Sequence, residues 1–251
     1  MPLVVHIHPD PATLGQAAGE EAAEVIRGAL ATAGEATIVI ATGASQFATL
    51  ATLVAAPGID WSRVTIFHLD EYARLPADHP ASFRRYLRER FIERLPASPA
   101  AFHPIAAETF PAAECRRLAR LVPRGPFDLA LVGIGENGHL AFNDPPADFA
   151  TREPYLVVSL DAACRRQQVR EGWFPDLDSV PTEAVSMSVR RMLDSHRTVC
   201  SVPDARKADA VRAALEGPVT PRCPASILRE APWPVSLHLD TAAAAGLSRP
   251  G

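Results

Sequence analysis

TIVIATGASQFATLATLVA, residues 37–55, sets the fold class, because a strand, a glycine turn and a helix follow one another in it without a gap. TIVIAT (37–42) is rich in apolar, β-branched residues and has no polar alternation, which is typical of a strand covered on both faces. From Gly43 onward the apolar residues recur at helical spacing. The segment therefore predicts one strand–helix unit of a buried parallel sheet.

The same alternation of short apolar runs and helical patterns extends outward from this segment across the chain. Further helices are expected over residues 11 to about 33, 79–95, 111–122 and 205–217. Further strands are expected at LVVHIH (3–8), VTIFHLD (64–70), FDLALVGIG (127–135), YLVVSL (155–160), AVSMSV (184–189), RTVCSVP (197–203) and VSLHLD (235–240). We find no repeat or linker that would divide the chain. The prediction is an α/β fold in one domain, residues 1–251: a single doubly wound, mostly parallel, Rossmann-like sheet with helices on both faces.

The composition excludes several classes of function. The net charge of −4 leaves no basic excess of the kind that a nucleic-acid partner requires. No apolar stretch reaches the roughly 18 residues of a membrane span, and the first ten residues, MPLVVHIHPD, lack the pattern of a signal peptide. The four cysteines are far apart and form neither a CxxC pair nor a zinc-like cluster. We therefore expect a cytoplasmic protein with free thiols, no metal site and no membrane partner.

In doubly wound sheets, ligands bind beyond the carboxyl ends of the strands, so polar residues that directly follow strands are the candidates for a site. The first group is Thr42, Gly43, Ala44 and Ser45, which lie between a strand and a helix. A glycine turn and free N–H groups at a helix start favour an anion, and phosphate is the natural occupant. The alternative is a turn with an N-cap serine and no ligand.

The second group follows the strand over residues 64–70 and contains Asp70 and Glu71. Carboxylates at the end of an apolar strand are costly in a core but suited to proton transfer in a cleft, and Asp70 is a candidate general base. The alternative is that one of the two acids caps the following segment by binding backbone amides.

The third group is GIGENGHLAFNDP (133–145), in which three glycines precede His139 and Asp144 follows five residues later. Histidine titrates near neutral pH, and a nearby carboxylate can orient it and favour its protonated form. The pair could move a proton to or from a sugar ring oxygen. GxGxxG also occurs in dinucleotide sites, but here a polar loop follows the glycines where that motif needs a helix.

The fourth group centres on Lys207, the single lysine among 25 basic residues. It lies near the start of an expected helix, where a positive charge is unfavourable unless an anion is bound there. We expect Lys207 to bind phosphate, and a solvated surface lysine is the alternative.

Together these segments resemble the glucosamine-6-phosphate deaminase/isomerase family, a relative of the 6-phosphogluconolactonases. FHLDEYARLPADHPASFRRYL (67–87) resembles that family's segment around its catalytic aspartate. GIGENGHLAFNDP resembles its histidine loop, and IVIATGAS (38–45) resembles its phosphate loop. Order and spacing agree from about residue 37 to residue 215.

The resemblance implies aldose–ketose isomerisation with deamination of a hexosamine 6-phosphate, foremost glucosamine 6-phosphate to fructose 6-phosphate and ammonia. It implies no cofactor, because the substrate amine becomes the electron sink. Asp70 would move a proton between C2 and C1, His139 would assist ring opening, and Asp144 would support the histidine where the family usually has glutamate. The residues implied to hold the phosphate are Thr42, Gly43, Ala44, Ser45, Lys207 and an arginine of a mobile segment, Arg165 in preference to Arg170.

Two positions depart from the family pattern. Asn137, a further member of the expected catalytic group, stands where many members have aspartate, and Asp144 is one methylene shorter than glutamate. These departures are the only support for a sugar-phosphate sensor that lacks activity. A lactonase-like hydrolase is the nearer alternative, although FHLDEY and AFNDP favour the deaminase. The sequence does not determine which hexosamine epimer is the substrate or whether the protein forms a homo-oligomer.

Overall fold

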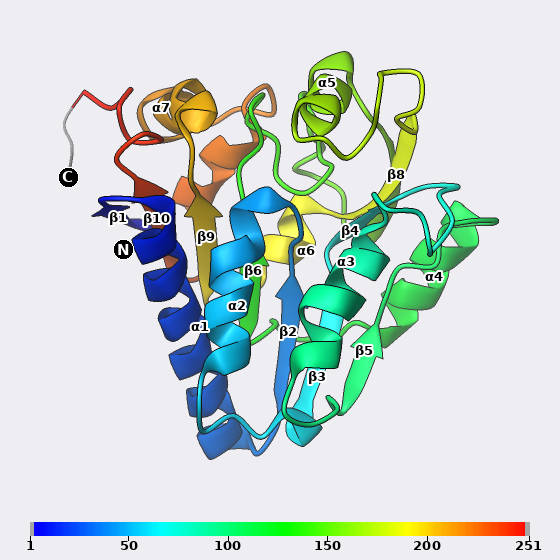
Figure 1. The fold of residues 1–251 in the computed structure, drawn as a ribbon, viewed down its shortest axis with the longest axis vertical. Helices are drawn as coiled ribbons and strands as arrows, with labels where there is room; N and C mark the ends of the chain where they lie inside the picture. The colour runs from blue at the N-terminus through cyan, green and yellow to red at the C-terminus, as the bar shows by residue number, and fades with distance from the viewer. Residues whose placement is uncertain (1–2, 249–251) are drawn as a thin grey trace.

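The protein is described by a computed structural model over residues 3–248, and it contains a central parallel sheet of seven strands (Figure 1). The strand order is β1-β10-β9-β6-β2-β3-β5, and every neighbouring pair is parallel. This confirms the predicted α/β class. The strands are β1 (Leu3–His8), β2 (Ala36–Ile40), β3 (Val64–His68), β5 (Ala101–His103), β6 (Leu129–Val132), β9 (Thr198–Val202) and β10 (Val235–Asp240).

The order of the strands reverses between β2 and β6. From β2 the chain adds β3 and then β5 on one side, and it returns to add β6, β9 and β10 on the other side. Connections on the two sides of such a point diverge and leave a crevice at the carboxyl ends of the strands. The loops that follow β2 and β6 are the first and third predicted groups, so both meet at this switch point.

Helices cover both faces of the sheet, as predicted. α1 (Pro11–Ala33), α2 (Phe47–Ala55) and α3 (Phe83–Arg90) lie on the face turned to the viewer in Figure 1 and pack on alternate strand residues, among them Ile38 and Leu129. α4 (Pro111–Leu121), α6 (Val189–Leu193) and α7 (Ala208–Glu216) pack on the other face around Val39 and Ala130. The two apolar clusters follow the alternation of side chains along a strand.

Two predicted strands lie outside the parallel sheet, and this part of the prediction was wrong. The segments 155–160 and 184–189 form β7 (Tyr155–Ser159) and β8 (Glu183–Met187), which pair antiparallel with each other and with β4 (Asp70–Tyr72). β7 alternates between more and less buried residues, and Val157 is 38% exposed. Such alternation is typical of an antiparallel sheet with one face toward solvent. β4 begins directly after β3, so the chain passes from one sheet to the other at Asp70.

α1 and α2 pack unusually closely because α1 has glycine at two positions one turn apart. A Cβ atom on Gly15 would lie 2.1 Å from the Cβ of Ala48, and one on Gly19 would lie 2.6 Å from the Cβ of Thr52. α2 starts just after the first predicted group, so this contact fixes the position of that loop. Within residues 3–248 no helix combines the length and hydropathy that a membrane crossing requires.

Candidate active site

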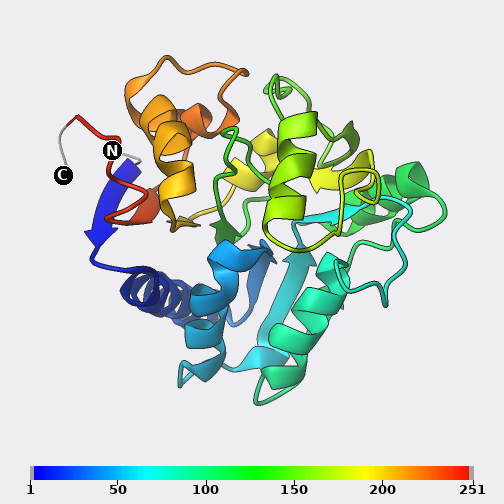
Figure 2. The ribbon, with the colours of Figure 1, turned by 45° about the horizontal axis from the view of Figure 1, so that its top comes forward.

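A cavity of about 230 Å³ opens at the carboxyl ends of the central strands, which Figure 2 turns toward the viewer. Its wall contains residues from the loops after β2, β3, β6 and β9, and from α5 (Ala162–Arg170). The structure therefore brings the four groups, predicted from separate parts of the sequence, to one place. The predicted residues on the wall are Thr42, Gly43, Ala44, Ser45, Asp70, His139 and Lys207.

The loop after β2 has the geometry of an anion site. Gly43 has φ of +93°, a conformation that side chains disfavour, so the turn favours glycine. A short 3-10 turn, Ala44–Gln46, then leads into α2, whose N-terminal N–H groups carry partial positive charge. The hydroxyl of Thr42 is buried, and no residue in the described range hydrogen-bonds to it. An oxyanion in the cavity would satisfy both the hydroxyl and the helix terminus.

The loop after β9 repeats this backbone geometry. Asp204 has φ of +91°, and a 3-10 turn, Ala205–Lys207, leads into α7. Lys207 has φ and ψ of −94° and −8°, close to the −95° and −7° of Gln46 at the start of α2. A non-glycine residue at positive φ is strained, and such strain is typical of functional sites. Two helix N-termini thus face the cavity from the two sides of β6.

Lys207 is buried in the cavity wall, and its side chain is only 6% exposed. Its Nζ lies 3.8 Å from a carboxylate oxygen of Glu171, at the end of α5. Burial lowers the pKa of Lys207, and Glu171 opposes that shift. The structure therefore does not support the alternative of a solvated surface lysine.

Asp70 is buried at the step between the two sheets, and its Oδ1 receives no hydrogen bond from any residue of the described chain. Burial, together with the neighbouring Glu71, raises the pKa of Asp70 to about 8. A carboxyl group with a raised pKa and a free oxygen in a cavity is suited to accept a proton from a bound molecule.

Glu71 has the capping role that was the alternative for this pair of acids. Its carboxylate accepts hydrogen bonds from the backbone N–H groups of Tyr72, Phe83 and Arg84 and from the hydroxyl of Ser82, the N-cap of α3. Burial raises the pKa of Glu71, and these donors oppose that shift. Glu71 thus anchors α3 beside the cavity.

His139 lies in the glycine loop after β6, and its imidazole packs directly over Gly135. A Cβ atom on Gly135 would lie 2.2 Å from the ring atoms Cε1 and Nε2, so only glycine leaves room for the ring. Nδ1 of His139 lies 3.2 Å from Oδ1 of Asp144, so the shorter acid reaches the ring. Burial by itself would raise the pKa of Asp144, but His139 and Asn137 lower it below its ordinary value.

Asn137 holds two carboxylates together and contacts His139 only through the backbone. Its amide nitrogen donates to Oδ1 of Asp144 at 3.0 Å and to Oδ2 of Asp161 at 3.1 Å, and its oxygen accepts from the backbone N–H of His139. Asp161 caps α5 through the backbone N–H of Cys164. An aspartate at position 137 would place a third negative charge between the carboxylates of Asp144 and Asp161. The neutral amide of asparagine suits this position because it donates a hydrogen bond to each of them. Asp161 was not predicted from the sequence, because an N-cap aspartate has no distinctive pattern.

Neither predicted arginine of α5 reaches the cavity wall in this structure. Arg165 donates to the carbonyl oxygen of Leu177, and Arg170 pairs with Glu136. The arginine on the wall is Arg206, which binds Asp204 at 2.7 Å and lies 3.7 Å from Glu136. Arg206 directly precedes Lys207 in the sequence. Its position next to a predicted phosphate-binding residue could have identified Arg206 as a candidate. α5 instead contributes Gln167, Gln168 and Glu171 to the wall.

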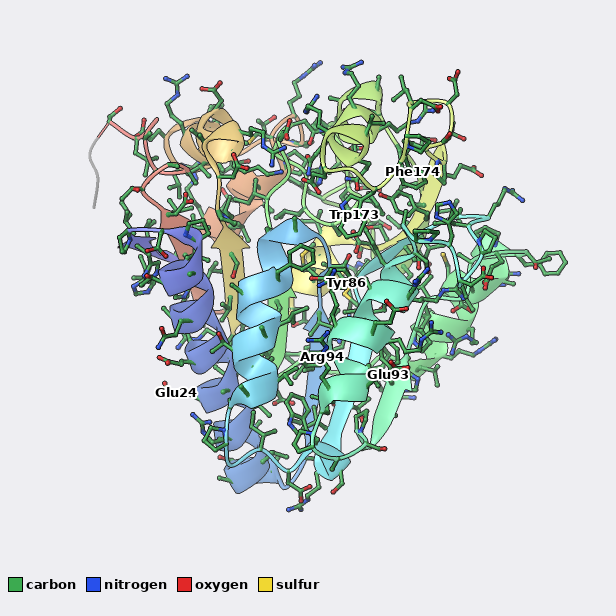
Figure 3. All side chains as sticks on the ribbon, in the orientation of Figure 1. Glu24, Tyr86, Glu93, Arg94, Trp173 and Phe174 are labelled. Atoms are coloured by element: carbon green, nitrogen blue, oxygen red, sulfur yellow. The ribbon has the colours of Figure 1, made fainter. Side chains whose placement is uncertain are left out.

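The segment after α5 is held against α2 and α3 by an aromatic contact. Trp173 packs against Tyr86 of α3 and Phe47 of α2, and Figure 3 labels Trp173 and Tyr86 where α5 meets α3. The Tyr86 hydroxyl donates to the carbonyl oxygen of Gly43 in the loop after β2. The segment that carries the predicted arginines is thus connected to the anion site through two side chains.

The comparisons with known proteins agree with this arrangement. The profile of a family described as glucosamine-6-phosphate isomerases/6-phosphogluconolactonase matches residues 9–233. Glucosamine-6-phosphate deaminase from Pseudarthrobacter chlorophenolicus is 36% identical over 91% of this chain and 88% of its own. Glucosamine-6-phosphate deaminase 1 from Bacillus subtilis is also 36% identical, over 77% of this chain and 81% of its own.

Solved structures extend the likeness to three dimensions. A monomeric glucosamine-6-phosphate deaminase superposes with a TM-score of 0.87 at 31% identity, covering 98% of this chain and all of the other. The 6-phosphogluconolactonase of Trypanosoma brucei superposes with a TM-score of 0.78 at 20% identity, covering 99% of each chain, which shows a shared fold. The match of the profile to most of the chain, and of the relatives at 36%, shows that this protein belongs to the glucosamine-6-phosphate isomerase/6-phosphogluconolactonase family.

Proposed function

We propose that this protein converts glucosamine 6-phosphate and water to fructose 6-phosphate and ammonia. The observation that carries the proposal is Asp70: a buried acid with a raised pKa and a free oxygen, in one cavity with His139 and two helix N-termini. The deaminases among the relatives support the same activity.

The substrate phosphate binds between the loops after β2 and β9. Thr42 offers a hydroxyl without a partner in the described chain, α2 and α7 offer N-terminal N–H groups, and Lys207 offers a buried positive charge. Phosphate attracts the ammonium of Lys207 away from Glu171, which then becomes free to accept a hydrogen bond from a sugar hydroxyl. Charge-assisted contacts of this kind are about twice as strong as neutral ones.

Ring opening is assigned to His139. The ring oxygen must gain a proton as its bond to C1 breaks, and the C1 hydroxyl must lose one. An imidazole ring can both donate and accept a proton, and the Asp144 carboxylate lies 3.2 Å from Nδ1 of His139, where it orients the ring. Asn137 and Asp161 act one step further away, because they hold the Asp144 carboxylate in place.

Isomerisation is assigned to Asp70. Its ionised carboxylate takes the proton from C2 of the open-chain amino aldehyde, and the electron pair forms the C1–C2 double bond while the carbonyl π pair moves to O1. O1 takes up a proton from solvent, which gives an enolamine. The same carboxyl group returns the proton to C1, which leaves an iminium at C2. Water adds to C2 and ammonia leaves, so that the products are the ketose phosphate and ammonia.

The test is product formation by purified protein supplied with glucosamine 6-phosphate, with galactosamine 6-phosphate and 6-phosphogluconolactone in parallel. Equal amounts of ammonia and fructose 6-phosphate from the first substrate are expected. The Asp70→Asn variant should lose both products, and Asp60→Asn, an exposed acid in a turn outside the cavity, should retain them. Lactone hydrolysis without ammonia would replace the proposal with the hydrolase alternative, and ammonia from the galacto epimer alone would change the substrate.

A cytoplasmic location is part of the same proposal. Cys115, Cys164, Cys200 and Cys223 are all free thiols, which supports a reducing compartment.

A further inference from the structure

Three histidines and a glutamate gather at the edge of the central sheet that lies away from β5. His6 and His8 project from the same face of β1, and His238 of β10 is the register partner of His6. Glu21 reaches them from α1, which covers this face of the sheet. None of these four residues lines the active-site cavity, and Figure 1 shows β1, β10 and the start of α1 together at one side of the molecule.

The side chains converge at distances that suit a shared ligand. Nε2 of His238 lies 2.9 Å from Oε2 of Glu21, and the His6 and His238 rings are stacked with centroids 4.9 Å apart. One nitrogen of His6, one nitrogen of His238 and one oxygen of Glu21 all lie within 4.8 Å of one another. Two ligand atoms at a tetrahedral zinc centre, each about 2.0–2.1 Å from the metal, are about 3.3 Å apart, so His238 and Glu21 would separate slightly to admit an ion.

A second layer of contacts orients the ligand atoms. Nδ1 of His238 is 3.1 Å from Nε2 of His8, and such a bond would fix the ring with Nε2 toward Glu21. The other oxygen of Glu21 accepts from the hydroxyl of Ser236 at 2.6 Å and lies 3.5 Å from Arg197. Metal-binding histidines and carboxylates are held by outer hydrogen bonds of this kind.

We propose that His6, His238 and Glu21 bind one divalent transition-metal ion of the zinc type, with His8 as the residue that positions His238. Two imidazoles and a carboxylate are a ligand set that zinc accepts, with the remaining position open to water. His6 is exposed, so the ion has a direct path from solvent.

A hydrogen-bonded chain without metal, from His8 through His238 to Glu21, is the competing explanation of the same contacts. The two explanations differ at His6, whose ring stacks on His238 but takes no part in the hydrogen-bonded chain among residues 3–248. His6→Gln therefore removes a metal ligand and leaves the hydrogen-bonded chain intact.

The experiment is calorimetric titration of zinc chloride into the full chain, purified without a histidine tag and freed of metal by chelator. One zinc per chain is expected at this site. His6→Gln should weaken its binding about a hundredfold or more, and His8→Ala should weaken it about 10–100-fold, as loss of an outer contact does. His196→Gln is the matched control, because that histidine is 52% exposed beside Asp128 and remote in sequence from the cluster.

A second group of potential ligands lies in the active site and contains His139, Asp144 and Cys164. Zinc bound there must be distinguished from zinc bound at the proposed site. His139→Gln should leave the proposed zinc site intact. The proposal is overturned if no zinc binds at concentrations up to about 100 µM, if His6→Gln binds like the wild type, or if only His139→Gln abolishes binding.

Discussion

Asp70 and Glu71 are adjacent in the sequence, yet their carboxylates differ in the number of hydrogen bonds that they accept. Four donors surround Glu71, whereas Oδ1 of Asp70 has no partner in the described chain. Because side chains alternate along β4, the two acids point to opposite faces of the small sheet. One face anchors α3 and the other faces the cavity, so adjacent acids acquire a structural and a chemical role.

Replacement of Asp70 by asparagine should abolish turnover and stabilise the fold. General base catalysis typically contributes about 10²–10⁴-fold, which sets the smallest loss expected. In the folded state the carboxyl keeps its proton up to about pH 8, whereas its ordinary pKa is 3.8. The unfolded chain therefore binds fewer protons at this group between these values, so the contribution of Asp70 to the stability of the wild type falls as pH rises.

Urea unfolding of both proteins at pH 5, 6 and 7 measures this effect. The advantage of Asp70→Asn in the free energy of unfolding should grow with pH, and Asp60→Asn should show no such growth. An advantage that is constant with pH would mean that Asp70 is ionised in the folded protein throughout.

The value of kcat/KM should rise with pH through an apparent pKa near 8, because only ionised Asp70 can accept the C2 proton. Glu71 contributes to the raised pKa, so Glu71→Gln should shift this rise to lower pH. The amine of the free substrate titrates in the same pH range and could also cause such a rise. Its pKa does not depend on the protein, so a substitution in the protein would not shift a rise caused by the amine. A rise that stays in place in folded Glu71→Gln would assign it to the substrate.

At the scale of elements, α1 contains a matched pair of glycines. Gly15 packs against Ala48 of α2, whereas a Cβ atom on Gly28 would meet nothing within 4 Å. Gly28→Ala should stabilise the protein by about 0.5–1 kcal/mol, as alanine does in a helix. Gly15→Ala should destabilise it by about 1–3 kcal/mol through overpacking. Urea unfolding compares the two, and equal effects would contradict the close contact between α1 and α2.

Asn137 connects the loop after β6 to the start of α5, because its amide donates hydrogen bonds to both Asp144 and Asp161. Asn137→Asp should reduce kcat, because three carboxylates then compete near His139 and loosen the position of Asp144. Adding Asp161→Asn should restore much of the loss, since asparagine is an equally good N-cap for α5. The double-mutant cycle in kcat measures the coupling, and additive losses would show that the two positions act independently.

Sequence patterns predicted six of the seven strands of the central sheet and the groups at their ends, because burial on both faces produces long apolar runs. They missed β5, since its three residues are too short to form such a run. They did not place β7 and β8, since a segment of five mostly apolar residues suits either sheet. They also named Arg165 and Arg170 of α5 rather than the residues that line the cavity. Gln167, Gln168 and Glu171 line the cavity whereas Arg165 faces Leu177, and the choice of helix face depends on packing between elements far apart in the chain.

At the scale of the whole molecule, the cavity joins strands from both halves of the sheet, so a bound anion should stabilise the entire fold. A ligand that binds only the folded state, at a concentration one hundred times its Kd, adds about 2.7 kcal/mol to the free energy of unfolding. Inorganic phosphate should therefore raise the Tm of the wild type in a concentration-dependent way. Lys207→Ala should remove most of this shift, and Arg116→Ala, on the exposed face of α4, should not. An undiminished shift in Lys207→Ala would place the anion elsewhere.

The pairing of β1 with β10 has a consequence for how the protein is made. β1 ends at His8 and its partner begins at Val235, so the strand leaves the ribosome more than two hundred residues before its neighbour exists. At about 5–20 residues per second, that interval is roughly 10–45 s. During it the nascent chain carries an apolar strand that has no partner, and chaperones that bind extended apolar segments have their best opportunity at β1. A circular permutant that joins β10 to β1 through a short linker would synthesise the two strands together and close that interval.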